Sequence, residues 1–201
     1  MNEKFFDLKK EKQDRMINAA LKVFALNGYR HASTDDIVRE AAISKGLLFH
    51  YFENKLGVYA FVYDYSVRYL LLELSTAVDA KETDLFTLMQ QVETGKMHAM
   101  CGYPYLQPFL NRAQTENVSE ALLAVEERKQ QLEDYLESVF ARADLGKYAS
   151  AEDAVKLRKM LELTIKGLMN ERILEDAFQP EMLYEEITEY LNLSRRLAER
   201  S

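Results

Sequence analysis

The chain has 201 residues, of which 48% are hydrophobic and 29% charged, and it carries a formal net charge of −7. It is long enough for one large domain or two small ones, and no apolar run approaches the roughly 18 residues of a membrane span. The N-terminal residues are too polar for a signal peptide, and a single cysteine, Cys101, excludes an intrachain disulfide framework. We therefore expect a soluble cytoplasmic protein.

The charge is unevenly distributed along the chain. Residues 1–57 hold 10 Lys and Arg against 8 Asp and Glu, a net charge of +2, whereas residues 58–201 carry −9. Phosphate attraction depends on where cations are placed locally, so an acidic remainder does not exclude DNA as a ligand.

Apolar residues recur with helical period almost throughout, and no stretch shows strand alternation. The first helix has one apolar face, made by Ile17, Ala20, Leu21 and Phe24. Asn27-Gly28 predicts its C-terminal end, with the glycine in a left-handed conformation. Ser33 with Asp36 three residues later resembles a capping box at the start of a short second helix, which we expect residues 42–43 to end.

A third short helix follows a tight turn. Ser44 can cap it, and Leu48 and Phe52 share one face at a spacing of four residues. Asn54 can cap the helix after it. Two short helices joined by a tight turn, after a longer helix, are typical of a helix-turn-helix, which presents its second helix to the major groove of DNA.

Helix-breaking residues farther along the chain delimit further helices, and the sequence predicts an all-α fold of about nine helices. We expect these helices at about residues 54–76, from residue 83 or 84 onward, and at 119–142, 151–178 and 181–198.

The exposed side of the third helix carries groups suited to DNA. If Leu48 and Phe52 point inward, Lys45, His50 and Tyr51 point outward, where side chains can meet phosphates and base edges. A nearby glycine, Gly46, lets the backbone approach the duplex, and Lys55 can meet a phosphate. Four basic residues near the N-terminus could form an arm that reaches the DNA backbone, or they could simply be a solvated charged face. They are Lys9, Lys10, Lys12 and Arg15.

The stretch GYRHASTDDIVREAAISKGLLFHYFENKLGVYAFV at residues 28–62 resembles the DNA-binding signature of the TetR family of transcriptional regulators. The resemblance places Lys45, Gly46, Leu47, Phe49 and His50 on the DNA-facing side, and Thr34, Tyr51 and Lys55 at phosphates. Leu47 and Phe49 stand where the family often has Thr and Tyr, which removes two hydroxyl contacts. The DNA-binding set that we predict is Ser33, Thr34, Ser44, Lys45, Gly46, Leu47, Phe49, His50, Tyr51 and Lys55.

The resemblance also implies two domains: a DNA-binding domain at residues 1–57 and an effector-binding and dimerisation domain at residues 58–201. Dimerisation follows independently, because two recognition helices related by a two-fold axis can read a pseudo-palindromic operator that one helix cannot select. The predicted dimer interface is Met160, Leu161, Leu168, Met182, Ile187 and Leu191; the alternative is that this surface packs within one subunit.

Soft and aromatic side chains near a chain break suggest a pocket for a small, largely apolar effector. The candidates are Tyr65, Tyr69, Phe86, Met89, Met97, Met100, Cys101, Tyr105 and Phe109, although the same residues could form an ordinary core. The sequence thus predicts a dimeric repressor released from its operator by such an effector. The alternative is a helical regulator or interaction module controlled by a protein partner.

An enzyme is disfavoured. Cys101 and His98 could suggest a nucleophile and base, but no orienting group or oxyanion donor accompanies them. The histidines are too scattered for a metal site, and no glycine-rich phosphate loop occurs. We therefore expect no metal and no cofactor.

Overall fold

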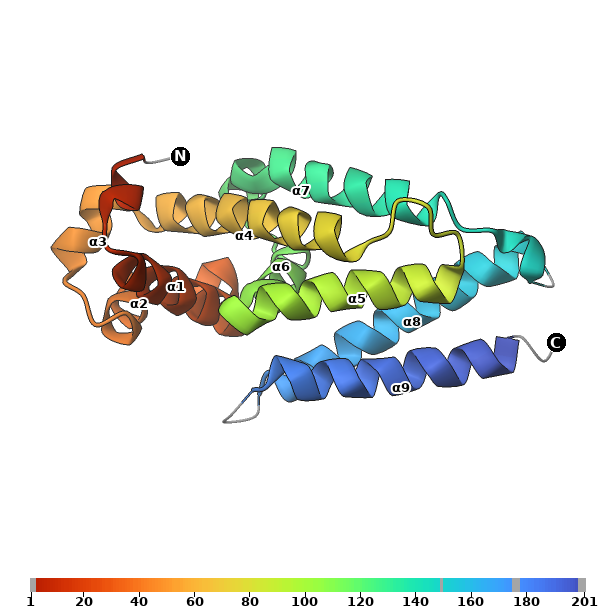
Figure 1. Cartoon of the computed structure of the whole chain (residues 1–201). Helices are drawn as coiled ribbons and strands as arrows, with labels where there is room; N and C mark the ends of the chain where they lie inside the picture. The colour runs from red at the N-terminus through yellow and green to blue at the C-terminus, as the bar shows by residue number, and fades with distance from the viewer. Residues whose placement is uncertain (1–2, 149, 175–177, 199–201) are drawn as a thin grey trace. The chain divides into compact units, whose positions relative to one another are not determined.

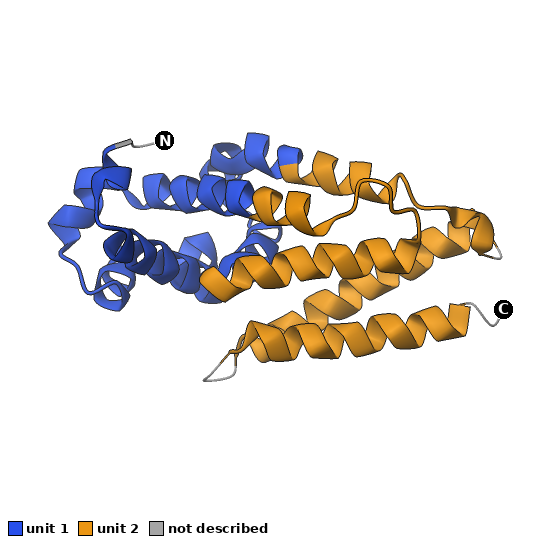
Figure 2. Ribbon diagram, in the orientation of Figure 1, with its two compact units in different colours: residues 1–69, 103–131 blue, residues 70–102, 132–201 orange. Residues whose placement is uncertain are grey.

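The computed structural model describes residues 3–148, 150–174 and 178–198, in which helices are joined by turns and no strand occurs (Figure 1). The chain divides into two compact units (Figure 2). Unit 1 comprises residues 1–69 and 103–131, and unit 2 comprises residues 70–102 and 132–201. The all-α prediction is confirmed. The predicted division into a DNA-binding domain at residues 1–57 and an effector-binding and dimerisation domain at residues 58–201 concerns function, and it stays a prediction.

Unit 1 is built around the first long helix, which packs along α6 and against α2, while α2 packs against α3. Its core includes the fully buried side chains of Leu21, Phe24, Ile37 and Leu48. The elements of unit 1 are η1 (Glu3–Asp7), α1 (Lys10–His31), α2 (Thr34–Glu40), α3 (Lys45–Phe52), α4 (Lys55–Ala77) as far as residue 69, α6 (Leu106–Ala113) and α7 (Ser119–Phe140) as far as residue 131.

The caps of the first two helices follow the sequence closely, with two differences. Gly28 has a φ of 67°, as expected, but it interrupts α1 rather than ending it, because Ala32 N donates to Gly28 O and the helix runs on to His31. The Ser33 hydroxyl accepts from Asp35 N, as a cap should. The carboxylate expected to complete a capping box, that of Asp36, pairs with an arginine of α2.

Unit 2 contains α5 (Leu85–Gly102), η2 (Leu145–Lys147), α8 (Ala151–Arg172), α9 (Pro180–Ala198) and the C-terminal parts of α4 and α7. The α9 helix packs against both α5 and α8. Gln90 of α5 donates to Tyr184 Oη at 2.7 Å and to Thr188 Oγ1 at 3.0 Å, which ties α5 to α9. No helix in the described parts of the chain combines the length and apolar character that a membrane crossing requires.

The turn between α3 and α4 leaves no room for a side chain at position 57, which is a glycine. The Asn54 carboxamide caps α4 by accepting from Gly57 N at 2.8 Å. A Cβ added at Gly57 would lie 2.0 Å from the Phe52 carbonyl oxygen, whereas one added at Gly46 would meet no atom within 4 Å. Glu53, between the two helices, has a φ of 62°. The sequence analysis did not single out Gly57.

We predict that Gly57→Ala lowers the free energy of unfolding by about 1–3 kcal/mol or more, because the backbone of the turn must move to admit a methyl group. The matched control, Gly46→Ala, should leave stability unchanged or raise it by up to about 1 kcal/mol, because alanine favours a helix. Urea denaturation followed by circular dichroism measures both changes. Equal stability of the two variants would contradict the prediction.

Candidate nucleic-acid interface

One side of α3 is anchored and the other is accessible. Leu48 is fully buried and Phe52 is 6% exposed, as the helical spacing predicts. Lys45 and His50 are exposed on the outer side, and Tyr51 is half-buried. The side of this eight-residue helix that carries the expected DNA contacts is therefore accessible to solvent.

The other predicted DNA-binding residues lie on this surface or at its edge. The Ser44 hydroxyl caps α3 by accepting from Leu47 N at 3.2 Å, so it is occupied as a cap. Gly46 is exposed, and Leu47 and Phe49 are half-buried. Ser33 and Thr34, at the start of α2, are also half-buried.

The Lys45 ammonium is held in a defined position. It lies 2.8 Å from Asp35 Oδ1 and 6.0 Å from the centre of the Phe49 ring. The two side chains of the ion pair are 51% and 66% exposed, respectively, so water screens the pair. The pair therefore positions Lys45 without burying it.

An N-terminal segment that the sequence analysis did not place supports the end of α3. Phe5 of η1 is fully buried and its ring contacts those of Tyr51, Phe52 and Phe61, at centroid distances of 5.8, 5.3 and 4.8 Å. The buried Gln13 carboxamide donates to Phe6 O and Leu8 O, which fixes the segment to α1. The two adjacent phenylalanines in an otherwise polar N-terminus are the signal that could have indicated this anchor.

The expected basic arm is part of α1 and the residue before it. Lys9 and Arg15 are exposed, and Lys12 is half-buried. Lys10 pairs with Asp14 at 2.8 Å. These groups form a charged face, and a role in DNA binding stays a prediction.

Lys55, a predicted phosphate contact, makes several interactions inside unit 1. Its ammonium donates to Tyr29 O at 2.9 Å, and to Ala32 O and Arg30 O at 3.3 and 3.4 Å. It also lies 4.5 Å from the centre of the Tyr29 ring. Carbonyls near the end of a helix carry partial negative charge, which a cation stabilises. Lys55 therefore joins the start of α4 to the end of α1.

The same end of α1 is held from the segment between α6 and α7. Glu116 accepts from Tyr29 N at 2.8 Å, and the Tyr29 hydroxyl donates to Glu120 at 2.6 Å. Burial would raise the pKa of Glu116, but backbone amides of Asn117, Tyr29 and Val118 donate to the carboxylate, and its pKa lies below the ordinary value. Glu116 is therefore a charged structural group at neutral pH.

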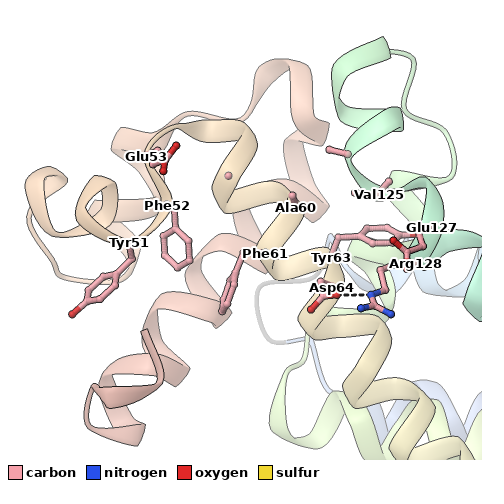
Figure 3. A pocket seen from close by; sticks show the side chains of 12 residues that line it. Tyr51, Phe52, Glu53, Ala60, Phe61, Tyr63, Asp64, Val125, Glu127 and Arg128 are labelled. Atoms are coloured by element: carbon pink, nitrogen blue, oxygen red, sulfur yellow. Dashed lines mark hydrogen bonds and ion pairs between the residues drawn. The ribbon is translucent and has the colours of Figure 1, made fainter. Parts of the chain in front are cut away.

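A groove of about 580 Å³ opens beside the α3–α4 turn (Figure 3). Aromatic side chains including Tyr51, Phe52 and Phe61 line it. Asp64, another lining residue, faces the Arg128 guanidinium and forms an ion pair with it. Arg68 pairs with the second carboxylate oxygen of Asp64 at 2.9 Å, so this acid is neutralised within the protein.

Four of the predicted effector-pocket residues belong to unit 1. Phe109 is 1% exposed and packs against core aromatic rings, so its surroundings are those of a core residue. Tyr65 and Tyr69 are stacked and half-buried, and the Tyr65 hydroxyl is hydrogen-bonded to that of Tyr103 at 2.7 Å. Tyr105 is half-buried and lines a shallow charged groove.

The other five belong to α5 in unit 2. Phe86, Met89 and Met100 are each 3% exposed and form part of the hydrophobic core of that unit. Met97 is half-buried, and Cys101 is exposed.

Cys101 is accessible but lacks the lowered pKa of a catalytic thiol. Partial burial of the sulfur and a hydrogen bond to Glu181 raise the pKa of the thiol, so it stays protonated at neutral pH. The described residues contain no group of three or more His, Cys, Asp or Glu side chains placed to hold a metal ion.

The predicted dimer-interface residues fall into two groups. Leu161, Ile187 and Leu191 are each 2% exposed within a single chain and belong to the core of unit 2. They cannot contact a second molecule while α8 and α9 keep this packing. Met160 and Met182 are 56% and 54% exposed. Leu168, the sixth, is half-buried and packs against the core.

The arrangement of α1, α2 and the anchored α3 is that of a helix-turn-helix, and comparison with known proteins agrees. Residues 16–60 match the model of the tetR family of bacterial regulatory proteins. The uncharacterized HTH-type transcriptional regulator YuxN of Bacillus subtilis is 36% identical over 78 residues, which span 37% of this chain and 26% of YuxN. The uncharacterized HTH-type transcriptional regulator TtgW of Pseudomonas putida is 41% identical over 49 residues, 24% of this chain and 37% of TtgW.

A solved structure extends the likeness of fold along the chain. A TetR family transcriptional regulator from Chloroflexus aurantiacus has a TM-score of 0.68 and 22% sequence identity, covering 98% of this chain and 96% of that one. The match to the tetR family thus lies in residues 16–60, which contain α2, α3 and most of α1, and the likeness beyond them is one of fold.

We predict that Lys55→Met lowers the free energy of unfolding by about 1.5–3 kcal/mol, since it removes charge-assisted hydrogen bonds to backbone carbonyls. The control, Lys45→Met, should change stability by less than about 1 kcal/mol, because its ion pair is exposed to water. Thermal and urea unfolding provide the measurement. A Lys55→Met variant as stable as the native protein would show that these contacts contribute little to the fold.

Proposed function

We propose that the protein is a sequence-specific DNA-binding repressor that acts as a homodimer and leaves its operator when a small, largely apolar effector binds. The observation that carries the proposal is the position of α3: buried along Leu48 and Phe52, and accessible along Lys45 and His50. A major groove about 12 Å wide admits one α-helix presented in this way.

The side chains on the α3 surface suit contacts with different parts of the duplex. Lys45 is a point charge at the start of the helix and suits phosphate or a base acceptor. Leu47 has no hydrogen-bonding group and suits the methyl group of thymine. Tyr51 is held against Phe5, and its phenol can donate to a phosphate oxygen without much loss of side-chain freedom.

A dimer is supported by exposed apolar side chains on the two C-terminal helices. Met160 and Leu163 of α8 are 56% and 57% exposed, and Met182, Leu193 and Leu197 of α9 are 54%, 45% and 62% exposed. Apolar surface concentrated on two adjacent helices is typical of an interface. We propose these exposed residues as the contacts with a second copy, in place of the buried Leu161, Ile187 and Leu191.

For release, we propose that the effector prefers a dimer in which the two recognition helices are spaced differently from the half-sites of the operator. By linkage, such an effector weakens DNA binding by the same factor by which DNA weakens effector binding. Five of the predicted pocket residues keep accessible surface: Tyr65, Tyr69 and Tyr105 in unit 1, and Met97 and Cys101 in unit 2. Operator affinity that is equal with and without a bound effector would contradict this part of the proposal.

We predict that selection from a random duplex pool recovers a pseudo-palindrome with half-sites about 34 Å, or a multiple of this, apart. Lys45→Ala and Tyr51→Ala should each weaken binding to the recovered duplex about tenfold or more, with unchanged helical content. Gel-shift titration at fixed salt gives the affinities, and Lys129→Ala on α7 is the matched control for loss of a lysine. Recovery of no preferred sequence, or unchanged affinity in both α3 variants, would overturn the proposal.

We predict that the double variant Met160→Glu, Met182→Glu is monomeric at concentrations where the native protein is dimeric, because burying unpaired carboxylates at an interface is strongly unfavourable. The change should leave the fold intact, since both side chains are exposed in one chain. Leu123→Glu is the control, because Leu123 is 79% exposed on α7, outside the proposed interface. Sedimentation equilibrium gives the masses; a dimeric double variant would place the interface elsewhere.

A further inference from the structure

The short helix α2 is acidic, although it lies next to the proposed DNA-binding helix in the chain. Each of its three carboxylates pairs with a cation, and each cation lies on a different helix. The pairs are Asp35 with Lys45 of α3 at 2.8 Å, Asp36 with Arg39 of α2 at 2.5 Å, and Glu40 with Lys22 of α1 at 2.6 Å. Of these three cations, Lys45 is the one on α3.

The contact between Asp35 and Lys45 joins the starts of the two helices. The Ser33 hydroxyl accepts from Asp35 N and caps α2, which places Asp35 in the first turn. Lys45 is the first residue of α3 and its ammonium also lies near the Phe49 ring. The carboxylate therefore occupies, on the proposed DNA-facing side, the position of an anion bound to Lys45.

We propose that Asp35 sets the strength of DNA binding by competing with DNA phosphate for the Lys45 ammonium; this inference rests on the proposed function. When the duplex binds, Lys45 exchanges the carboxylate for a phosphate or a base acceptor, and Asp35 is left beside a negatively charged ligand. The native protein thereby gains less from Lys45 than an unpaired lysine would give. Phosphate attraction supplies essentially all of non-specific affinity, so Asp35 restrains indiscriminate binding.

The size of the effect follows from the exposure of the pair. Screened surface ion pairs correspond to at most about a fivefold change in a binding constant. Salt dependence should change as well. An Asp35 carboxylate left unpaired in the complex takes up a cation from solution, which offsets part of the counterion release caused by Lys45. Removing the carboxylate should steepen the slope of log affinity against log salt by up to about 0.9.

The test compares Asp35→Asn with Asp36→Asn, which makes the same charge change at the next residue of α2 but releases Arg39 of the same helix. The probes are the duplex recovered by selection and a duplex of unrelated sequence, each titrated from 50 to 200 mM salt. We expect Asp35→Asn to tighten binding to both duplexes about three- to fivefold and to steepen the salt slope. Asp36→Asn should change affinity less than twofold.

A second pair of variants assigns the effect to Lys45. In a Lys45→Met background, Asp35→Asn should tighten binding no more than Asp36→Asn does. Equal effects of Asp35→Asn and Asp36→Asn, or an Asp35→Asn effect that persists without Lys45, would overturn the inference and leave the proposed function intact. A native chain that binds neither duplex at 50 mM salt would overturn both.

Discussion

The burial of one side of α3 is the constraint on which the proposed interface depends. A helix of eight residues has little stability of its own, so its orientation is set by what its apolar side packs against. Leu48 and Phe52 provide that side, and Phe5 covers the end of the helix from the N-terminal segment. Because Gly57 has no side chain, α4 can begin close behind α3, which fixes where the helix ends.

Charge is used in two different ways in unit 1. Lys55 and Glu116 bind backbone groups around Tyr29, and both tie the end of α1 to other elements. Such contacts order the structure because the backbone partners cannot move away. By contrast, Lys45 and Asp35 are side chains that both remain in water, so their pairing can be exchanged for another ligand. The mildly basic N-terminal region therefore presents fewer uncommitted cations than its composition implies.

Unit 2 illustrates how helical periodicity can mislead at adjacent positions. Met160 and Leu161 are equally apolar neighbours on α8, yet the first is 56% exposed and the second 2% exposed. On α9, Leu191 is buried and Leu193 is 45% exposed. Periodicity predicts that these helices have apolar stripes, but a helix that packs in its own chain and also meets a second copy needs two stripes. Which residue belongs to which stripe depends on the positions of α5 and α9.

Much of unit 1 was predictable because its signals are local. The positive φ at Gly28, the caps at Ser33, Ser44 and Asn54, and the inward face of α3 all depend on residues within about four positions of one another. The all-helical class follows in the same way from apolar spacing and the scarcity of breakers. The resemblance carried by residues 28–62 pointed to the family whose model matches residues 16–60.

The tertiary structure decided what depends on residues far apart in the chain. Three examples are the packing of Phe5 on Phe61, the bonds from Lys55 to three carbonyls, and the bond between Tyr29 and Glu116. These contacts join residues separated by 23 to 87 positions. The short helix α6, for which the sequence analysis predicted no separate helix, lies along α1. A sequence pattern reports the preference of a segment, whereas a distant contact exists only when the whole unit has folded around it.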